Sequence, residues 1–149
     1  KNKHNKFIFK TKTLNDNSTL SQKKFIIKAN LENWKLIEGG PSTDLIKNAK
    51  LIIGLNSTAL VEGLILKKII ISPLFNSKNI NKKFLFDYKD TVIYVRNKKE
   101  YFSYLSKILI SSKKFKNLSK NRSVVLKNLI GNSDGKSSSR LNKFIKKII

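Results

Sequence analysis

Two short apolar runs, separated by a polar turn and an amphipathic segment, constrain the fold of this chain more than any other feature. Leu51–Ile53 is typical of a buried strand, and Gly54 lets the chain leave that strand in an unusual conformation. Asn56 or Ser57 then caps a helix, and Ile69–Ile71 is the next buried strand. A strand–helix–strand unit implies a parallel sheet, so we expect the two apolar runs to lie parallel, in adjacent or nearly adjacent positions.

The rest of the chain continues the alternation of strand and helix patterns. Expected strands are Phe7–Phe9, Trp34–Ile37 and Thr91–Val95. Expected helices are Leu20–Ala29, Lys99–Ile110, Lys116–Leu129 and Ser137–Ile148, together with a short helix that Ser42 and Thr43 can cap and that runs through Asn48. Gly39-Gly40-Pro41 indicates a turn, and Asn76–Asp87 a loop. This order predicts the α/β class, a parallel sheet flanked by helices. With 149 residues and no internal repeat, the chain is expected to form a single domain over 1–149, with a terminal helix segment over 131–149.

The net charge of +23 is a weak guide to partners. Of the 32 basic residues only Arg96, Arg122 and Arg140 are arginines, and abundant Lys, Asn and Ile indicate an A/T-rich coding bias. Base readout usually depends on arginine, so nucleic acid is disfavoured, whereas an anionic membrane surface or substrate stays open. There is no Cys, and His4 alone cannot build a metal site. Without an apolar run of about 18 residues or a signal-peptide pattern, we expect a cytoplasmic protein, with peripheral contact at the inner face of the plasma membrane left open.

The turn before the central helix has the chemistry of an anion site. It lies at the carboxyl end of a strand and the amino end of a helix, where backbone N–H groups and the helix dipole favour negative charge. Asn56, Ser57 and Thr58 add polar side chains there, and Glu62 lies one turn further along. A phosphate at the helix tip and a ribose at the carboxylate would suit this pattern. The alternatives are a plain helix cap and a solvated carboxylate.

Three segments carry a resemblance to a known group. The stretch from Asp44 to Leu64 with Lys67–Pro73, the opening Phe7–Lys12, and Gly131–Leu141 resemble segments of bacterial surface-carbohydrate (capsule and polysaccharide) biosynthesis proteins. Those proteins look like GT-B glycosyltransferases, whose carboxyl-terminal, Rossmann-like half binds a nucleotide-sugar donor. Gly63 departs from the pattern, because Ala is common there and Gly weakens a helix.

The resemblance implies a donor-binding domain of a metal-independent GT-B transferase that acts in surface polysaccharide biosynthesis. The substrate would be a nucleotide-activated donor, with no cofactor. Taken from the resemblance and from the chemistry of the residues together, the residues predicted to bind the nucleotide are Lys10, Lys12, Gly39, Gly40, Asn56, Ser57, Thr58, Glu62, Asp134 and Arg140. Simpler roles are open for some of them: solvated charges for the two lysines, a turn for the glycines, and a cap of the last helix for Asp134.

The absence of Met and the strand pattern close to position 1 favour a fragment of a longer two-domain protein. The partner would be an amino-terminal half that binds the acceptor, and the isolated piece would bind donor without turnover. Two alternatives are a nucleotide-sugar epimerase-like enzyme, which the scarcity of His disfavours, and a non-catalytic basic module for anionic membrane or nucleic acid. The sequence identifies neither the catalytic base nor the donor sugar, the acceptor or the oligomeric state.

Overall fold

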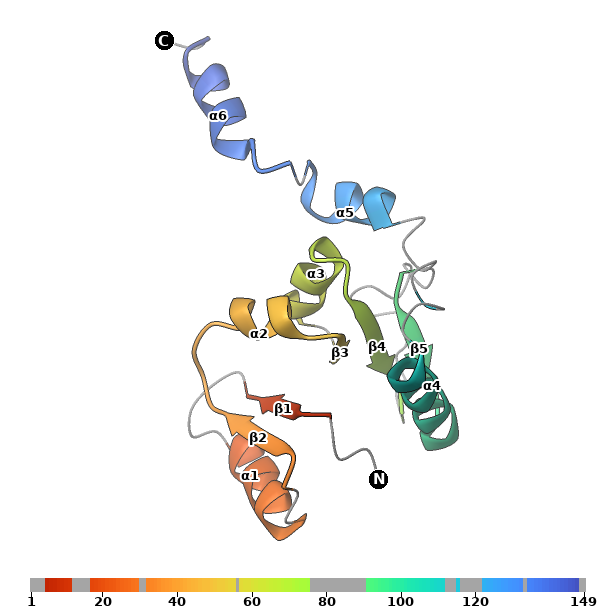
Figure 1. Cartoon of the computed structure of the whole chain (residues 1–149). Coiled ribbons are helices and arrows are strands. Elements are labelled where there is room, and N and C mark those ends of the chain that lie inside the picture. The colour runs from red at the N-terminus through yellow and green to blue at the C-terminus, as the bar shows by residue number, and fades with distance from the viewer. Residues whose placement is uncertain are drawn as a thin grey trace. The chain divides into compact units, whose positions relative to one another are not determined.

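The computed structural model describes residues 5–11, 17–29, 32–55, 57–75, 91–111, 115, 122–132 and 134–147. These residues belong to two compact units, 1–42 and 43–149, which are coloured along the chain in Figure 1. The loop expected over Asn76–Asp87 lies outside the described residues, as do Lys12 and Asn56 of the expected nucleotide site.

The first unit is a strand–helix–strand element. Strand β1 (Phe7–Lys10) pairs in parallel with β2 (Trp34–Ile37), and helix α1 (Asn17–Ala29) connects them. The register sets Phe7 opposite Trp34, and their rings stack with centroids 5.0 Å apart. Both strands were expected from their apolar runs. A parallel pair also needs a crossover connection between its members, and α1 supplies it.

The second unit contains the central sheet. Strands β3 (Leu51–Ile53), β4 (Ile69–Pro73) and β5 (Ile93–Val95) lie in that order, all parallel, with Ile52 opposite Ile70 and Ile71 opposite Ile93. The predicted parallel, adjacent pairing of Leu51–Ile53 with Ile69–Ile71 is confirmed. Strand β5 is shorter than the expected strand over Thr91–Val95. Thr91 and Val92 are buried, but the pairing of β5 with β4 begins only at Ile93.

Helices cover both faces of this sheet. The covering helices are α3 (Thr58–Ile65), α4 (Lys98–Ile110) and α5 (Arg122–Ile130). The unit also contains α2 (Thr43–Asn48), which contacts α3, and α6 (Ser137–Ile145), which follows Gly131 and has no buried residue. One core cluster joins α3 and α5 to one face through Leu60, Val61, Leu64, Ile70, Val92, Val125 and Leu126. The other joins α4 to the opposite face through Ile71, Ile93, Val95 and Ile108. Parallel strands, helical crossovers and helices on both faces make the architecture α/β and Rossmann-like (Figure 1).

The crossover helix α3 approaches the sheet closely at Gly63. A Cβ atom added there would lie 2.5 Å from Cδ1 of Ile52 and 3.4 Å from Cδ1 of Ile70. Gly63 has a low helix propensity, but its lack of a side chain leaves room for the side chains of Ile52 and Ile70. The unusual conformation predicted at Gly54 is not found, since this residue is not among the described glycines with positive φ. Its glycine instead avoids a tight contact, because a Cβ there would lie 3.2 Å from Cδ2 of Leu60.

We expect Gly63→Ala to lower the free energy of unfolding by about 1 kcal/mol, because overpacking outweighs the helix-propensity gain. Combined with Ile52→Val, which removes the obstructing Cδ1, the same substitution should become neutral or stabilising by up to about 1 kcal/mol. Urea denaturation of the four proteins in this double-mutant cycle measures the coupling. Additive effects would contradict the close approach.

Candidate functional site

The polar turn between β3 and α3 is organised by Ser57. This residue is the N-cap of α3, with extended backbone (φ −119°, ψ 140°), and its Oγ accepts a hydrogen bond from the Ala59 N–H at 3.3 Å. The Ser57 carbonyl accepts a second bond, from the Leu60 N–H, at 2.9 Å. The predicted capping role is therefore confirmed for Ser57, and it engages two of the first N–H groups of the helix.

Groups capable of contacting a ligand are still present at this helix tip. Thr58, the first helical residue, is exposed, and at that position a backbone N–H has no acceptor within the helix. The Ser57 hydroxyl accepts from Ala59 and keeps its own proton for donation. The tip therefore offers two hydroxyl groups and one amide N–H to an anion, beside the positive end of the helix dipole.

Glu62 lies one turn further along the same helix. It is half-buried between the buried residues Val61 and Gly63, four positions after Thr58, so the two side chains lie on one side of α3. Within the described ranges its carboxylate has no ion pair or hydrogen bond in the structure. A half-buried carboxylate without a cation is suited to accept hydrogen bonds from ligand hydroxyl groups.

In the first unit the structure brings together two of the predicted site residues, Lys10 and Gly39. Lys10 ends β1, and its Nζ donates to the Gly39 carbonyl at 2.8 Å and to the Thr11 carbonyl at 3.1 Å. Gly39 and Gly40 follow β2 with φ of 61° and 72°, a left-handed conformation that favours glycine. The turn expected at these glycines is confirmed, and the Lys10 ammonium lies at the carboxyl-terminal edge of the parallel pair.

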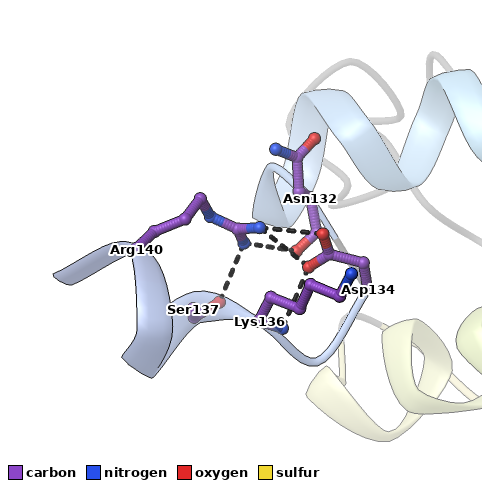
Figure 2. A network of polar contacts seen from close by, with 5 residues as sticks. All are labelled: Asn132, Asp134, Lys136, Ser137 and Arg140. Atoms are coloured by element: carbon purple, nitrogen blue, oxygen red, sulfur yellow. Dashed lines mark hydrogen bonds and ion pairs between the residues drawn. The ribbon is translucent and has the colours of Figure 1, made fainter. Parts of the chain in front are cut away.

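Asp134 and Arg140 also meet, in a network confined to residues 132–140 (Figure 2). The Arg140 guanidinium donates to both Asp134 carboxylate oxygens, at 2.9 and 2.8 Å, and more weakly to the Ser137 hydroxyl and the Asn132 carbonyl. Asp134 also accepts the Lys136 N–H at 3.0 Å. This bond and the Arg140 guanidinium hold the pKa of Asp134 below its usual range. The pair holds the turn that precedes α6. The cap of the last helix considered for Asp134 is not found, because Lys136 is the N-cap of α6 and no side chain caps the helix.

Sequence reasoning missed two buried polar residues. Thr11 follows β1, is only 4% exposed, and donates its N–H to the Ile37 carbonyl at 3.1 Å. Arg122 is 9% exposed at the start of α5 and donates to the Lys68 carbonyl at 3.3 Å, and burial lowers its pKa. The scarcity of arginine was the available signal for Arg122, but neither periodicity nor charge distinguishes a buried arginine from a solvated one.

Within the described parts of the chain, no group of three His, Cys, Asp or Glu side chains could hold a metal ion. No helix there is long and apolar enough to cross a membrane. Comparison of the chain with protein-family models, curated proteins and solved structures finds no match.

Proposed function

We propose that this chain is the donor-binding domain of a metal-independent GT-B-type glycosyltransferase that contributes to bacterial surface polysaccharide synthesis. The transferred group would be a sugar or a related group, carried on a nucleotide. The observation that carries the proposal is the β3–α3–β4 unit, in which Ser57 and Thr58 stand at the helix tip after β3 and Glu62 lies one turn along. In parallel α/β sheets, this end of the strands is where ligands bind.

The chemistry assigned to these residues is electrostatic. The Thr58 N–H and the hydroxyls of Ser57 and Thr58 would donate to the diphosphate, and the Glu62 carboxylate would accept from ribose hydroxyls. Negative charge grows on the diphosphate as the bond to the transferred group breaks, so preorganised donors stabilise the transition state.

Isothermal titration of the 149-residue chain with UDP, CDP, GDP, ADP and pyrophosphate tests this proposal. We expect at least one nucleotide to bind, and Ser57→Ala combined with Thr58→Ala to weaken that binding by about 1–3 kcal/mol, because two donors to phosphate are lost. Glu62→Gln should weaken nucleotide binding and leave pyrophosphate binding unchanged, because its proposed contact is with the ribose.

A matched control separates ligand binding from helix capping. Asn97 is the N-cap of α4, and its Oδ1 accepts the Glu100 N–H at 2.9 Å. Asn97→Ala should lower stability by about 1 kcal/mol, comparable to loss of the Ser57 cap, and leave nucleotide affinity unchanged. No binding of any nucleotide would contradict the proposal. An equal loss of affinity in Asn97→Ala and in the double variant would show that Ser57 acts only as a helix cap.

A further inference from the structure

The last helix separates apolar and cationic side chains completely. Every residue of α6 and of the turn that follows it, 137–147, is exposed. Leu141, Phe144 and Ile145 are 58%, 62% and 42% exposed, and at 3.6 residues per turn they fall within an arc of about 100°. Three large apolar side chains thus form one uncovered stripe along a nine-residue helix.

The other side of α6 is cationic. Arg140, Lys143 and Lys146 lie within an arc of about 120° opposite the apolar stripe, with Lys147 beside them. No acidic residue occurs from 135 to 147 of the sequence, and Asp134, which precedes the helix, is paired with Arg140. A largely polar composition, one concentrated apolar face and a polar face rich in Lys characterise helices that lie in the plane of a membrane interface.

We propose that α6 binds an anionic lipid surface, with Leu141, Phe144 and Ile145 inserted among the acyl chains and the lysines on lipid phosphates. Charge complementarity selects this occupant, because a bilayer matches an uncovered apolar stripe and a cationic face at once. Nucleic acid would contact only the lysines and not the apolar stripe. The net charge of +23 strengthens long-range attraction to such a surface. This inference is independent of the proposed nucleotide site, since none of its residues is in α3.

The test is flotation of the 149-residue chain with vesicles of phosphatidylcholine alone and of phosphatidylcholine mixed equally with phosphatidylglycerol. Binding is expected on the mixed vesicles and not on phosphatidylcholine alone. An apolar-face variant carries Leu141→Ser, Phe144→Ser and Ile145→Ser; a charge variant carries Lys143→Gln, Lys146→Gln and Lys147→Gln. Each is expected to bind the mixed vesicles about tenfold more weakly or worse. Because α6 contains no buried residue, the thermal unfolding of both variants should match that of the unsubstituted chain.

Matched controls make the same chemical changes elsewhere. The apolar control carries Phe102→Ser, Ile110→Ser and Val124→Ser, all at exposed positions, and the charge control carries Lys98→Gln, Lys99→Gln and Lys127→Gln. Both should bind within about twofold of the unsubstituted chain. Equal losses in the α6 variants and the controls would overturn the proposal, since attraction would then come from diffuse charge. Retained vesicle binding by the apolar-face variant, or a dimer of the chain that this variant dissociates, would overturn it as well.

Discussion

Leu64→Ala is expected to lower the free energy of unfolding of the second unit by about 2–5 kcal/mol. Leu64 is 0% exposed on α3 and packs in the core cluster between that helix, α5 and the sheet, so truncation leaves a cavity that close-packed neighbours cannot fill. Urea denaturation followed by far-UV circular dichroism measures the loss. The neighbouring Leu66, 37% exposed, is the matched control, and Leu66→Ala should cost less than about 1 kcal/mol. Equal losses would contradict the burial of Leu64.

The same experiment tests the predicted single domain. Trp34 is the only tryptophan of the chain and belongs to the first unit, whereas Leu64 belongs to the second. If residues 1–149 unfold as one cooperative domain, Leu64→Ala shifts the Trp34 fluorescence transition together with the circular dichroism transition. A fluorescence midpoint that does not move would show that the units unfold independently and would contradict the single-domain prediction.

Substitution of Arg122 has the second large expected effect on stability, and the size of that effect depends on the replacement. Arg122 is 9% exposed, its Nη2 donates to the Lys68 carbonyl at 3.3 Å, and its Nε has no hydrogen-bond partner among the described residues. Burial lowers the pKa of this guanidinium, since the charged form loses hydration. We therefore expect Arg122→Met, which keeps the apolar volume without the charge, to leave stability within about 1 kcal/mol of the unsubstituted chain.

Arg122→Ala should be about 2–4 kcal/mol less stable than Arg122→Met, because it also removes the buried side-chain stem. Thermal and urea denaturation of both variants measure the difference. Arg96→Met is the matched control at an exposed arginine, with an expected change of about 0.5 kcal/mol or less. If Arg122→Met destabilises the chain as much as Arg122→Ala, the expectation is wrong. The guanidinium would then contribute more to stability through its hydrogen bond than it loses in hydration.

Apolar runs and turn residues predicted the elements well. The predicted bounds of β2 and β3 and the predicted end of α2 agree with the structure, as does the parallel pairing of β3 with β4. These features follow from local periodicity and from crossover geometry, which a single sequence contains. The end of β5 was less predictable: Thr91 and Val92 have strand propensity and are buried, but only Ile93–Val95 finds a partner in β4. Ladder pairing depends on the neighbouring strand, which propensity does not encode.

The candidate site shows the same difference between features set by adjacent residues and features set by tertiary contacts. The sequence by itself determined that Ser57 caps a helix after a buried strand and that Gly39 and Gly40 make a turn, because capping and left-handed turns depend on adjacent residues. Only the tertiary structure decided which polar groups meet. Lys10 reaches the Gly39 carbonyl across 29 positions, and Arg122 reaches that of Lys68 across 54. Such contacts form when folding brings distant backbone together, and no periodicity in the sequence records the distance between side chains that lie far apart along the chain.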